Sequence, residues 1–185
     1  MKGQAPKNLD KIISLLKKEV KKFKIPIATK IGNKTRDPFR VLISCILSLR
    51  TKDTTTGPAC KRLFKLASTP EKMLKLPNKK IEKAIFPVGF YPTKTRYIKK
   101  TCKALIENYN GKVPDTMDEL IKLPGIGRKC AGLTLIYGHN KTESIPVDTH
   151  VFKVTNRLGW VKTKTPEKTE QELMKIIPKK YWHDL

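Results

Sequence analysis

The chain has 185 residues and a large excess of positive charge, with 40 lysines and arginines against 16 aspartates and glutamates and a formal net charge of +24. This length suits one large domain or two small lobes. The charge favours binding to a polyanion through counterion release, with nucleic acid as the first candidate and a generic basic surface as the alternative. No signal peptide or membrane-spanning run is present, so we expect an intracellular protein.

Apolar residues that recur every three or four positions predict helices in the first half of the chain. Residues 1–8 are polar and expected to be loose, and residues 26–36 are expected to form a connector. Asp37 and Pro38 form a good helix start, as N-cap and first helical residue. The segment after them is apolar on nearly every side, which predicts the central helix of the core. The helices predicted in this half span residues 9–23, 38–49, 54–67, 70–76 and 78–85.

The second half is also predicted to be helical, so the fold class is all-α. An aromatic turn is expected at residues 87–92, and Thr116 and Glu119 have the spacing of a capping box. Asp148 is a predicted N-cap, and Gly138 is a predicted helix stop. The helices predicted here span residues 95–109, 116–122, 128–137, 149–158 and 166–177, with one more element starting at residue 179.

Residues 123–132 (LPGIGRKCAG) predict a tight hairpin between two helices. Pro124 ends helix propagation, and glycines at 125 and 127 permit backbone conformations that a Cβ resists. The N–H groups at the start of the second helix, with the positive end of its dipole, form an anion site.

Lys129 lies in the first turn of that second helix and shares a stripe with Leu133 and Ile136. A lysine that is partly desolvated near a positive helix end holds its proton less tightly, and a neutral amine is what a Schiff-base nucleophile needs. The alternative is a lysine that contacts phosphate. Asp148 is a candidate catalytic partner, and capping the following helix is its alternative role.

Several stretches together resemble the endonuclease III family of helix-hairpin-helix DNA glycosylases. They are the hairpin with its lysine, Val147–His150 (VDTH), Asn156–Arg157, residues 47–53 (LSLRTKD), similar to the family's LS-x-Q-T-x-D, and residues 87–91 (PVGFY) with Lys94 and Ile98–Lys99. The match covers roughly residues 37–183.

The resemblance implies a bifunctional N-glycosylase and abasic-site lyase that acts on oxidised pyrimidines in double-stranded DNA during base excision repair. It also implies two helical lobes with the active site in the cleft between them. Residues 31–140 would form a six-helix barrel lobe that contains the helix-hairpin-helix at 116–137. Residues 1–30 and 141–185 would form the second lobe. A monomer is expected, in the cytoplasm or nucleoid, or in the nucleus if the source is eukaryotic.

The resemblance assigns Lys129 as the nucleophile that attacks C1′ and Asp148 as the carboxylate that stabilises positive charge there. His150 is either a DNA contact or a structural helix residue. The remaining residues expected to contact DNA are Gly125, Ile126, Gly127, Arg128, Arg50, Thr51 and Lys52.

The chain departs from the family pattern at two points. Arg50 stands where the family has glutamine, which puts the damage preference in question. The family's four cysteines, spaced C-x6-C-x2-C-x5-C around a 4Fe-4S cluster, have no counterpart, so no cofactor or metal is expected in this chain. Its cysteines are expected to be buried thiols; they are Cys45, Cys60, Cys102 and Cys130.

These departures leave other functions open. The chain could be an abasic-site lyase, or a mismatch glycosylase for uracil or thymine with a different base pocket. It could also be a DNA-binding module that is catalytically inert because the C-terminal segment is missing.

Overall fold

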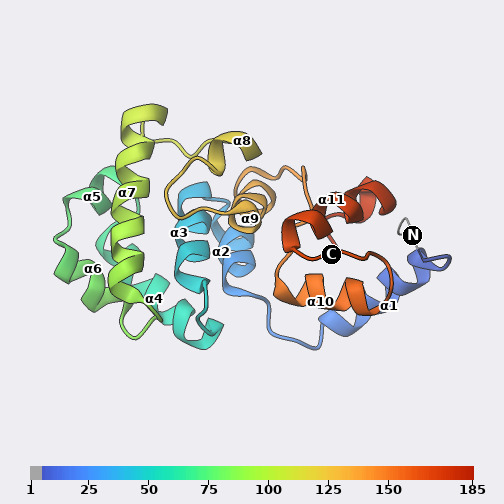
Figure 1. Ribbon diagram of the computed structural model, residues 1–185. Coiled ribbons are helices and arrows are strands. Elements are labelled where there is room, and N and C mark those ends of the chain that lie inside the picture. Colours follow the sequence, from blue (N-terminus) through green and yellow to red (C-terminus); the bar gives the residue numbers. More distant parts are fainter. Residues whose placement is uncertain (1–5) are drawn as a thin grey trace. The chain divides into compact units, whose positions relative to one another are not determined.

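The computed structural model describes residues 6–185, whose regular secondary structure is all helical, with eleven α-helices, one short 3-10 helix and no strand (Figure 1). This confirms the all-α prediction. The expectation that residues 1–8 are loose falls in part on residues 1–5, which lie outside the described residues. In residues 6–185 no helix is both long and apolar enough to cross a membrane. The chain divides into two compact units, Ile25–Lys141 and Met1–Lys24 with Thr142–Leu185.

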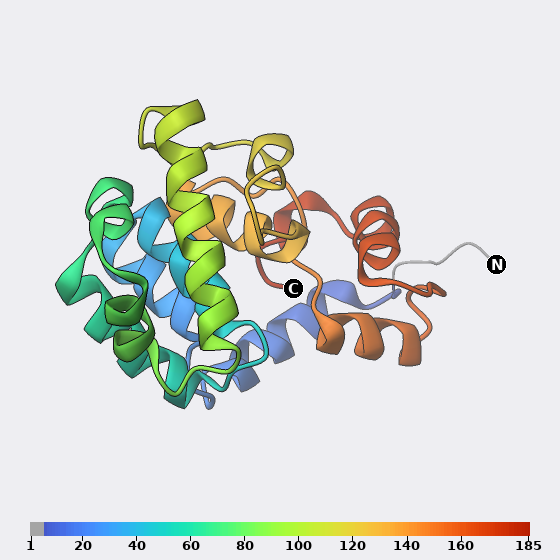
Figure 2. The ribbon, with the colours of Figure 1, turned by 60° about the vertical axis from the view of Figure 1, so that its left-hand side comes forward.

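The unit Ile25–Lys141 is organised around one buried helix, α3. All residues from Val41 to Leu47 are at most 1% exposed, as expected for a central helix. It packs against α2, α4, α7 and α9, and α7 runs alongside it (Figures 1 and 2). The helices of this unit are α2 (Ile27–Thr35), α3 (Pro38–Ser48), α4 (Asp53–Leu66), α5 (Pro70–Lys75), α6 (Asn78–Ile85), α7 (Tyr91–Tyr109), α8 (Met117–Leu120) and α9 (Arg128–His139).

The prediction of a connector at residues 26–36 is wrong, because most of that segment is helix α2. Its glycine, threonines and asparagine have low helix propensity, so packing rather than propensity stabilises it. Ala28 and Gly32 are buried, and a Cβ on Gly32 would lie only 2.5 Å from the Cβ of Tyr137 on α9. The glycine therefore lets α2 approach α9 closely.

Several helix boundaries also differ from prediction. Gly138 is not the stop of α9, because that helix continues to His139 and ends at Asn140, which has the left-handed backbone of a C-cap. Helix α7 begins at Tyr91, within the predicted aromatic turn, because Pro92 occupies its first turn, where a proline's missing N–H is not needed. Helix α1 ends at Val20, before the predicted end at Phe23, and Phe23 is 71% exposed. Because Phe23 does not pack into a core, extending the helix to this residue would bury no further apolar surface.

The second unit is formed by segments from both ends of the chain. Its elements are α1 (Leu9–Val20), α10 (Thr149–Arg157), α11 (Pro166–Ile176) and η1 (Lys179–Tyr181). They surround a small apolar core formed by Leu9, Ile13, Ile145, Val147, Trp160, Val161, Leu173 and Ile177.

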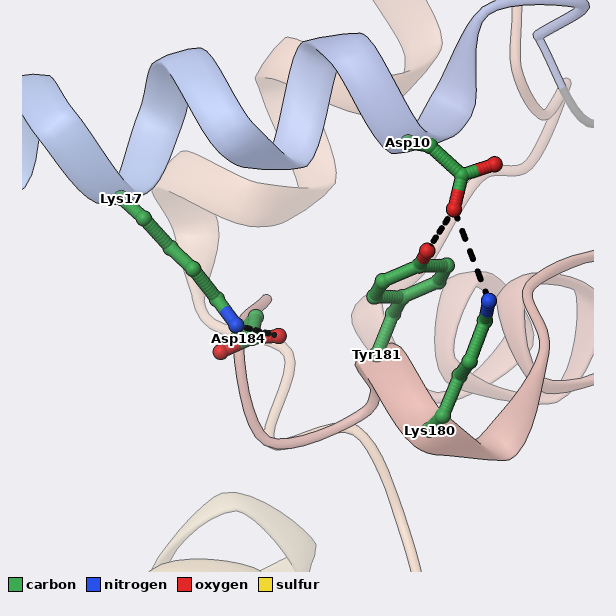
Figure 3. A network of polar contacts seen from close by, with 5 residues as sticks. All are labelled: Asp10, Lys17, Lys180, Tyr181 and Asp184. Carbon is green, nitrogen blue, oxygen red and sulfur yellow. Dashed lines mark hydrogen bonds and ion pairs between the residues drawn. The ribbon is translucent and has the colours of Figure 1, made fainter.

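Polar contacts at the surface of this unit link α1 to the C-terminal segment (Figure 3). Asp10 accepts hydrogen bonds from the Tyr181 hydroxyl and, at 3.5 Å, from the Lys180 ammonium. Lys17 forms an ion pair with Asp184 at 2.9 Å. Exposed ion pairs contribute little stability, so these contacts fix the register of α1 while the apolar core stabilises it.

Candidate active site

The hairpin between α8 and α9 is built from short backbone hydrogen bonds. Leu123 N donates to Leu120 O, and Ile126 N donates to Leu123 O, both at 3.1 Å. Leu123 and Ile126 are buried, which anchors the hairpin to the core. The expected N-cap bond of the capping box does not form: Thr116 makes no side-chain bond to the backbone of α8, and its hydroxyl instead donates to the Glu119 carboxylate at 2.8 Å.

The two hairpin glycines serve different purposes. Gly125 has φ +80°, and a Cβ there would lie 2.8 Å from the ring of Tyr97. Gly127 has an extended backbone, with φ −97° and ψ 172°, and nothing lies within 4 Å of the position of a Cβ. The prediction that both glycines adopt backbone conformations that a Cβ resists is therefore right for Gly125 and wrong for Gly127. Gly127 instead keeps the approach to the start of α9 open.

Lys129 is half-buried in the first turn of α9, between half-buried Arg128 and buried Cys130. A hydrogen bond with Cys45 of α3 lowers the pKa of the Cys130 thiol, and the positive charge of Lys129 acts in the same direction. The same hydrogen bond, together with burial, raises the pKa of Cys45. This buried thiol pair joins the turn that carries Lys129 to the central helix.

Asp148 is the N-cap of α10, as predicted. Its Oδ1 accepts from His150 N at 2.8 Å and Val151 N at 3.0 Å. Hydrogen bonds from backbone N–H groups hold a carboxylate in one orientation and favour its ionised form. Asp148 belongs to the second unit, whereas Lys129 belongs to Ile25–Lys141. Their meeting in a shared cleft stays a prediction.

The loop after α3 carries Arg50 and is held by two other segments. Arg50 is exposed and has φ 51°, in the left-handed region. The Lys94 ammonium donates to Leu47 O at 2.8 Å, Leu49 O at 2.5 Å and Thr51 Oγ1 at 3.0 Å. Gly89 N also donates to Thr51 Oγ1, at 3.2 Å. The loop is therefore a fixed structure from which the Arg50 side chain projects.

Helix α7 supports both the hairpin and this loop, a role that the sequence analysis missed. Lys94, Tyr97 and Thr101 lie on one face of it. Thr101 Oγ1 donates to Pro124 O at 2.8 Å, and Tyr97 packs beside Gly125. At about 1.5 Å per residue, Lys94 and Thr101 are roughly 10 Å apart along the helix. The hairpin and the Arg50 loop are therefore neighbours.

The remaining residues expected to contact DNA are on the surface. Lys52 and His150 are exposed. Phe90, which the sequence analysis did not select, is 62% exposed and follows Gly89, whose backbone contacts Thr51. An exposed phenylalanine next to the Arg50 loop is a further candidate for contact with a ligand.

The residues of this chain do not fit the iron–sulfur cluster of the resembled family. Each of the four cysteines is buried in a different helix of the Ile25–Lys141 unit, and none forms a disulfide. Within residues 6–185, no group of three or more His, Cys, Asp or Glu side chains could hold a metal ion.

An all-helical fold, a basic chain and a glycine hairpin that opens onto a helix start define a helix-hairpin-helix DNA-binding protein. Comparison with known families matches residues 43–179 to the HhH-GPD superfamily of base excision DNA repair proteins, and the chain belongs to this superfamily.

Similar proteins include endonuclease III of Thermotoga maritima, which is 46% identical over 151 residues, or 82% of this chain and 70% of that protein. Endonuclease III-like protein 1 of Gallus gallus is 40% identical over 149 residues, or 80% of this chain and 53% of that protein. The chain thus spans about half the length of the Gallus gallus relative.

Solved structures show the same fold. The structure of a non-covalent endonuclease III–DNA complex has a TM-score of 0.82 and 35% identity, covering 94% of this chain and 78% of that one. A trapped endonuclease III–DNA covalent intermediate has the same TM-score and identity, covering 94% and 79%.

Proposed function

We propose that this chain is a DNA glycosylase with abasic-site lyase activity that removes oxidised pyrimidines from duplex DNA. The observation that carries the proposal is the position of Lys129, in the first turn of a helix that begins at an open glycine hairpin. A relative of the same fold forms a covalent intermediate with DNA. A DNA substrate places the enzyme inside the cell, and we propose that it acts as a monomer.

Lys129 supplies the nucleophile in this reaction. Its neutral amine attacks C1′ of the damaged nucleoside, the C1′–N bond breaks, and the base leaves with the bonding electrons and takes up a proton. The sugar ring opens to give an imine between Lys129 and C1′. The imine acidifies the C2′ proton, and loss of that proton expels the 3′ phosphate by β-elimination. Hydrolysis of the imine then regenerates the lysine.

Asp148 is proposed to stabilise the positive charge that develops at C1′. Its carboxylate is oriented by two backbone N–H groups of α10. A preorganised negative charge needs no rearrangement during the reaction, which is why such groups lower barriers effectively. The same carboxylate can move protons between the leaving base and the sugar.

The DNA is proposed to contact the hairpin and the Arg50 loop together. The backbone of Gly125, Ile126 and Gly127, with Arg128, binds a phosphate at the start of α9. A base inside a duplex cannot reach Lys129, so the damaged nucleotide must leave the stack. Arg50, with its sequence neighbours Thr51 and Lys52, is proposed to face the gap this leaves, and His150 of the second unit is proposed as a separate DNA contact.

Borohydride trapping tests the proposal. The reductant converts the imine into a stable protein–DNA adduct, so a duplex with one abasic site should yield a covalent complex. Lys129→Ala should abolish the adduct, while Lys83→Ala, which changes an exposed lysine on α6, should leave it intact. An adduct that persists in Lys129→Ala would show that another amine is the nucleophile.

Arg50 favours a second candidate, because it replaces the family glutamine at the expected contact with the unpaired base. An arginine can stack on a base or pair with guanine, which fits a glycosylase for uracil or thymine mispaired with guanine. Cleavage of duplexes that carry thymine glycol, uracil opposite guanine, or an abasic site separates the candidates. Salt-sensitive binding to all three without any adduct would instead indicate an inert DNA-binding module.

A further inference from the structure

Lys94 is a buried lysine of α7 whose ammonium lies at the C-terminal end of α3. The residue is 5% exposed, and its ammonium donates to two carbonyl oxygens and one hydroxyl. A buried charge is tolerated only when it is hydrogen-bonded. Carbonyls at a helix C-terminus carry partial negative charge, so this site suits an ammonium. Burial still lowers the pKa of Lys94 to about 8.

The three acceptors of Lys94 surround Arg50 in sequence. Leu49 O precedes Arg50, and Thr51 Oγ1 follows it. The Thr51 hydroxyl also accepts from Gly89 N and donates to Leu49 O at 3.3 Å. Every polar group of this small network is thus used to fix the backbone on either side of one exposed residue.

Arg50 requires such support because its backbone is left-handed. A residue with a side chain is disfavoured in this region, so it persists only where its surroundings impose it. Gly89 closes the other side of the loop, since a Cβ there would lie 3.2 Å from Arg50 O. The loop therefore has little room to relax while Lys94 is in place.

We propose that Lys94 is a positioning residue, which holds Arg50 in the left-handed conformation that directs its guanidinium to the base opposite the lesion. This inference rests on the proposed function, which gives Arg50 its role at the DNA. Lys94 itself is buried and is not proposed to touch the DNA.

Helix α7 contains a matched control. Lys99 lies five residues further along, and its ammonium donates to Leu74 O and Leu76 O at the end of α5. Like Lys94, Lys99 donates hydrogen bonds to carbonyl oxygens at the C-terminus of another helix. The turn that it holds, however, has no proposed DNA contact. Replacing either lysine by methionine removes the hydrogen bonds and keeps most of the apolar stem.

The experiment measures the affinity for a duplex that carries an uncleavable abasic-site analogue opposite 2-aminopurine, whose fluorescence reports stacking on the unpaired base. Lys94→Met should weaken binding about tenfold and change the fluorescence of the complex, whereas Lys99→Met should match the parent. Circular dichroism confirms that each variant is folded.

A double-mutant cycle with Arg50→Ala decides whether Lys94 acts through Arg50. In the Arg50→Ala background, Lys94→Met should have no further effect on binding or fluorescence. Thr51→Val, which removes the hydroxyl that joins Lys94 to Gly89, should show the same dependence on Arg50 and serves if Lys94→Met does not fold. An equal loss in both backgrounds, or an equal loss in Lys99→Met, would overturn the inference.

Borohydride trapping by the parent chain keeps the two proposals separate. If the parent forms no adduct, the proposed function fails. If it forms the adduct and the cycle shows no coupling between Lys94 and Arg50, only the positioning role fails.

Discussion

The two helices that carry the candidate catalytic residues begin in opposite ways. Helix α9 starts at Gly127, which has no side chain and stands beside open space. Helix α10 starts at Asp148, whose carboxylate accepts two N–H groups of its own first turn. The N–H groups at a helix start without a capping side chain can bind an external anion. A carboxylate N-cap instead accepts hydrogen bonds from the N–H groups of its own helix. One start is therefore suited to hold DNA, and the other holds a charged group still.

The sharpest test of this difference separates the cap from the charge at Asp148. Asparagine is as good an N-cap as aspartate but is neutral. Asp148→Asn should keep the thermal stability of the parent and slow single-turnover cleavage of abasic duplex about a hundredfold.

Asp148→Ala is the companion variant, and it should lose the rate and also about 1 kcal/mol of stability. If Asp148→Asn cleaves as fast as the parent, Asp148 is only a helix cap.

The next largest effect is expected from the hairpin glycines. Gly125→Ala places a Cβ in a left-handed conformation and against the Tyr97 ring, so it should lower the free energy of unfolding by about 2 kcal/mol. Gly127→Ala should change it by less than about 0.5 kcal/mol, because the site is open and extended. Urea unfolding of both variants provides the measurement, and equal losses would contradict the two roles assigned here.

Gly127→Asp would make the start of α9 resemble that of α10. The new carboxylate should cap the helix and leave stability unchanged or raised by a few tenths of a kcal/mol. It should also repel phosphate and weaken binding to abasic duplex about tenfold. Fluorescence anisotropy at fixed salt measures the affinity, with Gly127→Ala as the uncharged control. Undiminished binding by the aspartate variant would show that DNA does not approach this helix start.

The end of α3 adds a third case, a helix terminus served by a lysine of another helix. The pKa of Lys94 is about 8 in the folded chain and ordinarily 10.5. Below pH 8 both states hold the proton; between these values only the unfolded state does, so stability rises with pH. Relative to Lys94→Met, the parent should therefore gain about 2 kcal/mol between pH 7.5 and 9.5. Urea unfolding at both values measures this, and a constant difference would contradict it.

Local chemistry made much of the fold predictable. The N-caps Asp37 and Asp148 accept backbone N–H groups as predicted, because a cap and its partners lie within three residues of each other. The central helix α3 could be recognised because a helix that is apolar all round has to be buried. The hairpin was predicted for the same kind of reason, since Pro124 and Gly125 act on their own backbone.

What the sequence by itself determined, then, was where the capped helices α3 and α10 start and which lysine follows the hairpin, since these depend on neighbouring residues. Only the tertiary structure showed that α2 is a helix, because its stability comes from packing Gly32 against Tyr137. Only the tertiary structure showed the task of Lys94, whose acceptor Leu47 lies 47 residues away in the chain. No periodicity or propensity records a contact at that separation, because it depends on how whole helices pack.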